Sequence, residues 1–134
     1  MTLQYSVAVR NAQLDQVEVV TGATAKLSIR TGTQPADCSQ ADAGSLLIQI
    51  TLPSDYLAAA ASGAKAKAGT WSGSATAGGT AGHWRLYDNA GTTCHAQGSV
   101  TATGGGGDMT LDNTNIASGQ VVTIGTFSLT AGNA

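Results

Sequence analysis

The stretch "HWRLYDNAGTTCHAQGSV", residues 83–100, decides the fold because it reads as two strands joined by a tight turn. Apolar and polar residues alternate on both sides of the central "DNAG", as they do in half-buried antiparallel strands. A register that pairs Asp88 with Thr92 leaves 89–91 as a three-residue loop. Gly91 then falls at the left-handed position that such loops favour. The pattern therefore predicts a β-hairpin.

This register divides the hairpin into an apolar and a polar face. Large side chains of the first strand lie opposite small ones of the second, Trp84 opposite Ala96 and Leu86 opposite Cys94. The other face sets Arg85 opposite His95 and collects four hydrogen-bonding side chains: His83, Arg85, Tyr87 and His95. Tyr and Arg are favoured anchors of protein interfaces, so we predict a protein–protein contact on this face, with a solvated sheet face as the alternative.

The hairpin also holds both histidines of the chain and one of its two cysteines, which raises metal binding and catalysis as alternatives. Strand alternation projects Cys94 and His95 to opposite sides of the hairpin. The imidazole therefore cannot act as a base for the thiol, and the two side chains cannot bind the same metal ion. Zinc needs three or four convergent ligands, and no acidic residue joins His83 and His95 on their face. The sequence contains no Gly-x-Ser-x-Gly elbow, phosphate loop or HExxH helix. We therefore predict no enzymatic activity, no metal site and no cofactor.

Alternation continues on both sides of the hairpin, in 26–30, 45–52 and 64–77, where the last segment uses unusually small side chains. In 121–130 the apolar positions change from even to odd, and a glycine-marked bulge at 125–126 repairs the phase. The predicted core consists of the inward residues of these strands: Leu27, Ile29, Leu46, Ile48, Ile50, Leu52, Trp84, Leu86, Val122, Ile124, Phe127 and Leu129.

The N-terminal segment "SVAVRNAQLDQVEVVTG" predicts a helix. Val7, Leu14 and Val17 recur at near-helical spacing, and Gly22 stands where a glycine would end the helix. The alternative is a short strand over 5–9 before a helix that begins near residue 11. One or two further helical turns are predicted in "SDYLAAAASG", residues 54–63.

Eight or so short strands preceded by one helix predict a mainly β fold, namely a jelly-roll-like antiparallel β-sandwich with one N-terminal α-helix. A length of 134 residues fits a single domain, with the helix in 1–22 and the sandwich in 23–134.

Composition and charge exclude several classes of partner. Only 10% of the residues are charged, and the six basic ones are scattered, with none after Arg85. Nucleic acid binding needs clustered cations, so we predict no nucleic-acid partner. No apolar run approaches the roughly 20 residues that span a bilayer, and the first residues lack the features of a signal peptide, which indicates a cytoplasmic origin and no membrane. Cys38 and Cys94 match no zinc or redox spacing, and in that compartment we expect free, half-buried thiols rather than a bridge.

The segments "AVRNAQLD" (8–15), "KLSIRTG" (26–32) and "GGTAGHWRLYDNAG" (78–91), with a strand closing in "LP" and a final strand, resemble small decoration, or cement, proteins of tailed double-stranded DNA bacteriophages. The resemblance carries no functional signature, so no site residues follow from it. It implies a jelly-roll-like virion protein that assembles in the host cytoplasm and forms homo-oligomers, with a dimer favoured. Such a protein lies on the outer capsid surface and bridges major capsid protein subunits.

The alternative function is a small phage adhesin or tail-associated module that binds carbohydrate. An aromatic platform in the loops would be its sign. Trp71, Trp84 and Tyr56 instead fall at positions predicted to pack inside the protein.

Overall fold

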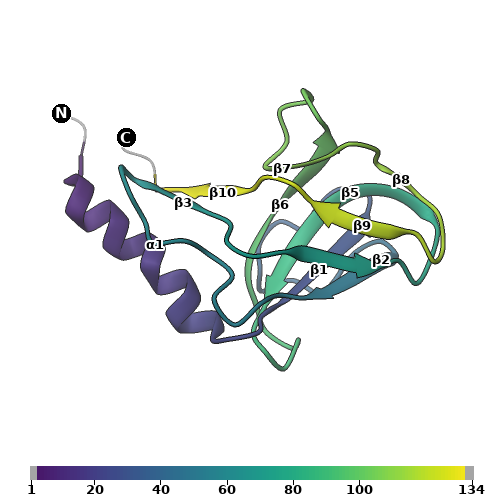
Figure 1. Cartoon of the computed structure of the whole chain (residues 1–134), viewed down its shortest axis with the longest axis horizontal. Helices are drawn as coiled ribbons and strands as arrows, with labels where there is room; N and C mark the ends of the chain where they lie inside the picture. Colours follow the sequence, from purple (N-terminus) through teal and green to yellow (C-terminus); the bar gives the residue numbers. More distant parts are fainter. Residues whose placement is uncertain (1–2, 132–134) are drawn as a thin grey trace.

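The computed structural model describes residues 3–131 and shows a mainly β protein with one α-helix (Figure 1). Residues 1–2 and 132–134 of the predicted domain lie outside the described residues. Helix α1 (Val7–Thr21) is followed by β1 (Lys26–Thr31), β2 (Leu46–Thr51), β3 (Ala64–Ala66), β4 (Trp71–Ser74), β5 (Gly79–Tyr87), β6 (Cys94–Ala102), β7 (Met109–Leu111), β8 (Asn115–Ile116), β9 (Val121–Ile124) and β10 (Ser128–Thr130).

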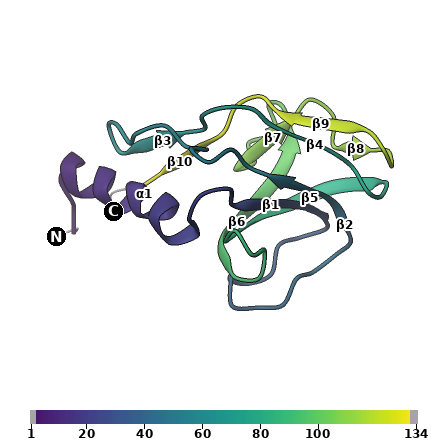
Figure 2. The ribbon, with the colours of Figure 1, turned by 60° about the horizontal axis from the view of Figure 1, so that its bottom comes forward.

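The strands form one large sheet and two strand pairs. The large sheet has the order β2-β1-β5-β6-β7, with β8 paired to β5, and only its β6–β7 pairing is parallel. Strands β4 and β9 pair with each other and lie in a layer over β1, β2 and β5 (Figure 2). The β3–β10 pair extends from this body toward α1 (Figure 1).

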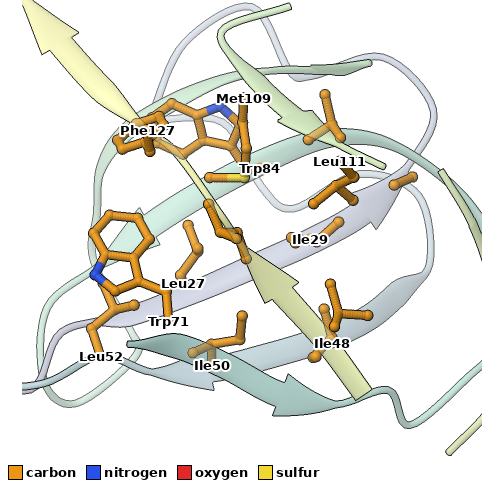
Figure 3. Packing of buried hydrophobic residues seen from close by; sticks show 14 of the residues in the cluster. Leu27, Ile29, Ile48, Ile50, Leu52, Trp71, Trp84, Met109, Leu111 and Phe127 are labelled. Atoms are coloured by element: carbon orange, nitrogen blue, oxygen red, sulfur yellow. The ribbon is translucent and has the colours of Figure 1, made fainter. Parts of the chain in front are cut away.

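The hydrophobic core lies between the large sheet and the β4–β9 pair (Figure 3). The predicted core is confirmed except at two positions, Leu46 and Leu129, which are both only partly buried. Trp71 and Met109 also fill this core.

The place predicted for Leu46 is taken by Leu47, which is fully buried. In the β1–β2 ladder Ile29 pairs with Ile48, but Arg30 pairs with Leu46, so β2 carries one extra residue. A bulge of this kind turns Leu47 inward beside Ile48. The strict alternation predicted for β2 is therefore wrong at its first residues.

The β5–β6 hairpin is confirmed, but its predicted register is wrong by two residues. Trp84 pairs with Gly98, where a Cβ would lie 2.8 Å from the indole nitrogen, so only glycine fits under this ring. The turn is longer than predicted, because the amide of Asp88 donates to the carbonyl of Thr93. Gly91 has the expected left-handed backbone, with φ of 75°.

The N-terminal helix is confirmed. The Ser6 hydroxyl accepts a hydrogen bond from the Val9 amide at its start, and Gly22, with φ of 77°, follows its last residue. The alternative strand over 5–9 is wrong, because α1 begins at Val7.

The helical turns predicted for 54–63 are wrong. Ala58 and Ala61 donate backbone hydrogen bonds to Ala66 and Ala64, so the segment is extended against β3, and the chain reverses through left-handed Ser62 and Gly63. Tertiary pairing overrides the high helix propensity of the alanine run. The bulge predicted in 121–130 is a full break, since β9 pairs with β4 whereas β10 pairs with β3.

Candidate functional site

The polar face predicted on the hairpin is buried. His83, Arg85 and Tyr87 are 0%, 1% and 5% exposed, because the segment 32–45 folds across that face of β5, as the long dark-blue loop at the bottom of Figure 2 shows. These three side chains are therefore not available for the predicted protein–protein contact, and they do not form the solvated face given as its alternative. His95 is exposed and lies apart from them, since Arg85 pairs with Gln97 in the observed register.

The guanidinium of Arg85 holds the covering segment in place. Its Nη1 donates to the Asp42 carboxylate at 2.6 Å, and its Nε donates to Oε1 of Gln97 at 3.1 Å. Its Nη2 lies 3.1–3.3 Å from three backbone carbonyl oxygens of the segment, those of Asp37, Cys38 and Gln40. One buried side chain thus satisfies four acceptors between residues 37 and 42 of the covering segment.

Asp42 receives bonds from three side chains. Besides Arg85, the hydroxyl of Tyr87 donates to it, and Nη2 of Arg30 lies 3.1 Å away. Burial alone would raise the pKa of Asp42, but the hydrogen bonds from Tyr87 and Arg85, with the charges of both arginines, lower this pKa below its ordinary value. The carboxylate is therefore ionised at neutral pH.

The lowered pKa of Asp42 predicts a loss of stability in acid. A depressed carboxyl pKa stabilises the folded state above the unfolded pKa of about 3.9, and this contribution is lost as the pH falls through the lower folded pKa. Because the Asp42 side chain is 40% exposed and solvent screens its charge, we expect Asp42→Asn to reduce the free energy of unfolding at pH 7 by only about 1 kcal/mol. The variant should also flatten the decline of this free energy below about pH 4. Urea unfolding from pH 2 to pH 7 measures both effects. The exposed Asp55→Asn is the control, and an equal acid decline in Asp42→Asn and the unchanged protein would contradict the assignment.

A hollow of about 620 Å³ opens beside this network. It is lined by residues 38–42, the side chains of Arg85 and Tyr87, and residues 91–94. Cys94 lies on this face, next to Tyr87 in the ladder, and not on the core face predicted for it, because the β5–β6 register shifts between Leu86 and Tyr87. The sequence could not reveal this shift.

The two cysteines meet at the hollow as thiols, and their sulfur atoms are 2.7 Å apart. Both are partly buried. Burial, and secondarily the hydrogen bond with Cys38, raises the pKa of the Cys94 thiol to about 12. His95 does not line the hollow, so the structure brings together Cys38, Cys94 and Arg85 instead of Cys94 and His95.

A second surface feature lies on α1, whose charged side chains all point toward the body. Nε of Arg10 donates to the carbonyl of Ala131 at 2.6 Å. Asp15 and Glu18 both bind Nζ of Lys65, at 2.8 and 2.9 Å. Lys65 is 3% exposed, and although burial lowers its pKa, the bonds from these two carboxylates raise it overall. The helix therefore docks through ion pairs as well as through the buried side chains of Leu14 and Thr21.

The opposite side of α1 carries no charge. We call it the outer face of α1, and its exposed members are Ala8, Val9, Ala12, Gln13, Gln16, Val19 and Val20. Val9, Val19 and Val20 are 42%, 68% and 57% exposed. A surface helix normally turns its charges outward and its apolar side chains inward. The uncharged outer face could have been predicted from the sequence, because a helical wheel places Arg10, Glu18 and Leu14 together on the other side of the helix.

Among residues 3–131, no group of three or more His, Cys, Asp or Glu side chains could hold a metal ion. None of the described helices has the length and apolar character needed to cross a bilayer. No family model, curated protein or solved structure matches this chain.

Proposed function

We propose that this chain is a capsid decoration protein of a tailed double-stranded DNA bacteriophage, which binds the outer face of the head and bridges major capsid protein subunits. The outer face of α1 carries the proposal. Its exposed valines and uncharged neighbours can be covered by a partner without desolvating any charge. It lies at one end of the molecule, clear of the β body (Figure 1).

The size of this face favours repeated contacts over one tight complex. A helix of 15 residues is about 22 Å long, so one of its faces is small beside the 1,200–2,000 Å² of a standard stable interface. Linked copies on a lattice gain avidity that a single small contact lacks. A shell with many equivalent subunits provides such a lattice, and we favour a homodimer as the form that binds it.

The body supports the proposal through its low charge. Only 10% of the residues are charged, and Arg85, Asp42, Lys65 and Glu18 are occupied within the fold. The β4–β9 layer over a curled sheet supports describing the body as a jelly-roll-like sandwich, although the parallel β6–β7 pair departs from the regular pattern. We place the protein on the virion surface after assembly in the host cytoplasm.

The alternative of a carbohydrate-binding adhesin lacks an aromatic platform at its expected residues. Trp71, Trp84 and Tyr56 are 1%, 3% and 0% exposed and therefore cannot stack on a sugar. No observation on the described residues favours it over the decoration role.

The outer face of α1 can be tested by charging it without disturbing the helix. Val9→Glu places a negative charge in the first turn and Val20→Lys a positive charge in the last, where both suit the helix dipole. We expect the double variant to fold with an unchanged Tm and to bind particles that lack the protein at least tenfold more weakly, which corresponds to about 1.4 kcal/mol. Co-sedimentation with such particles measures binding.

Val121→Glu is the matched control, because Val121 is 65% exposed and belongs to β9, a strand that lies away from α1 (Figure 1). The intact protein and this control should also raise the resistance of particles to heat and osmotic shock, whereas the double variant should not. Equal particle binding by the double variant would remove α1 as the contact. A protein that leaves shell resistance unchanged and binds in a glycan-array screen would overturn the decoration role.

A further inference from the structure

Two thiols from distant parts of the chain meet at the rim of the hollow beside Arg85. Cys38 belongs to the covering segment 32–45, and Cys94 is the first residue of β6, 56 positions later. Their sulfur atoms are 2.7 Å apart. From this placement we infer that Cys38 and Cys94 are a reversible redox site, whose disulfide fastens the covering segment to the sheet.

The backbone on both sides of the pair is held by buried groups. Arg85 donates to the carbonyl oxygen of Cys38 at 3.2 Å, and it is itself 1% exposed. On the other side, Cys94 pairs with the buried Tyr87 in the β5–β6 ladder. The two sulfur atoms are thus kept together by contacts that do not depend on a bond between them.

The site is open to a small oxidant. Both cysteines line the hollow of about 620 Å³, and each is only partly buried. Thiols that react selectively are partly accessible and lie near positive charge, whereas inert structural thiols are buried in apolar surroundings. The guanidinium of Arg85 lines the same hollow and supplies that charge.

The reaction proceeds by exchange with a low-molecular-weight disulfide, for which oxidised glutathione is the probe. Cys38 loses its proton to solvent, and its thiolate attacks one glutathione sulfur and releases the first glutathione thiolate, which takes up a proton. The sulfur of Cys94 then attacks Cys38, loses its own proton and releases the second glutathione. Two protein thiols are oxidised to one disulfide, and one small disulfide is reduced to two thiols. Burial and the hydrogen bond with Cys38 raise the pKa of the Cys94 thiol, so Cys38 is taken as the first nucleophile.

The bond would add a covalent link to the contacts that already hold the covering segment on β5. In the reduced protein the covering segment is held by hydrogen bonds and by the ion pairs of Asp42 with Arg85 and Arg30. In the oxidised protein the bond between Cys38 and Cys94 is added to these contacts.

The test uses the full chain in buffers with different ratios of reduced to oxidised glutathione. We expect the intact mass to fall by two hydrogen atoms in oxidising buffer, with loss of both titratable thiols, and to recover on reduction. The oxidised protein should unfold about 10 °C above the reduced one, as expected for a bond that closes a loop of this length. Cys38→Ser and Cys94→Ser should each abolish the redox dependence of Tm, and Cys94→Ser should stop at a mixed disulfide on Cys38.

Four outcomes would overturn the inference. They are retention of both thiols in oxidising buffer, disulfide-linked dimers in place of the intramolecular bond, an oxidised protein with the same Tm as the reduced one, and a metal bound to the cysteines in elemental analysis. The double serine variant, which keeps both side chains small and polar, controls for general oxidation. Particle binding is not measured, so failure of this test leaves the decoration role untouched.

Discussion

Replacing Arg85 by methionine is expected to lower the free energy of unfolding by about 3–5 kcal/mol. The guanidinium is 1% exposed, and its removal leaves the Asp42 carboxylate without its closest cation. The carbonyls of the covering segment lose the donor that joins them to β5. The partial exposure of the Asp42 side chain, 40%, places the loss toward the lower end of the range. Urea unfolding at pH 7 under reducing conditions measures it.

Two matched variants separate charge from geometry. Arg85→Lys keeps the charge, but a single ammonium cannot reach Asp42, Gln97 and the segment carbonyls together, so we expect an intermediate loss. Lys26→Met removes a cation whose Nζ makes an exposed hydrogen bond to Thr51, and it should cost less than about 0.5 kcal/mol. If Arg85→Met were as stable as the unchanged protein, Arg85 would not be what holds the covering segment.

The faces of the strands could be predicted from the sequence because burial alternates locally along a strand. Leu27 and Ile29 in β1, Trp84 and Leu86 in β5, and Ile124 in β9 all face the core as their spacing predicts. Each of these predictions needs only the residues of one strand.

The registers could not be predicted in the same way. A shift of the β5–β6 hairpin by two residues keeps Trp84 and Ala96 on the core face, so alternation cannot choose between Ala96 and Gly98 as the partner of Trp84. The choice depends on the space beneath the indole ring, where a Cβ at position 98 would collide. The extra residue at Leu47 is likewise visible only in the pairing of β2 with β1.

The candidate site was missed for a related reason. The sequence identified Arg85 and Tyr87 as a donor-rich face, but most of the acceptors of Arg85 are backbone carbonyls, which every residue carries. The covering segment has no alternation of apolar and polar residues. Asp42 is its one charged residue whose side chain binds Arg85 on the sheet. The outer face of α1 differs, because its lack of charge follows from residue spacing alone.

Replacing Trp71 by alanine is expected to destabilise the fold by about 3–5 kcal/mol, the usual cost of removing a large buried aromatic ring. Trp71 is 1% exposed, and its ring centroid lies 6.1 Å from that of Tyr56 and 5.4 Å from that of Phe127. It also begins β4 and pairs with Ile124 of β9. The cavity left by the missing ring would therefore lie between the β4–β9 pair and the large sheet (Figure 3). Denaturant unfolding and the loss of near-ultraviolet signal should report the change together.

Phenylalanine variants of the two tryptophans resolve what the ring and the N–H group each contribute. Nε1 of Trp71 donates to the carbonyls of Tyr56 and Ala68, at 3.1 Å each, whereas Nε1 of Trp84 has no acceptor among the described residues. Both replacements shrink the ring, but only Trp71→Phe removes a hydrogen bond. Trp71→Phe should therefore cost about 1 kcal/mol more than Trp84→Phe. An equal loss of unfolding free energy in the two variants would mean that Trp71 stabilises the contact between the β4–β9 pair and the large sheet through its ring alone. The carbonyl of Ala68 would then be solvated at no cost when the indole N–H is removed.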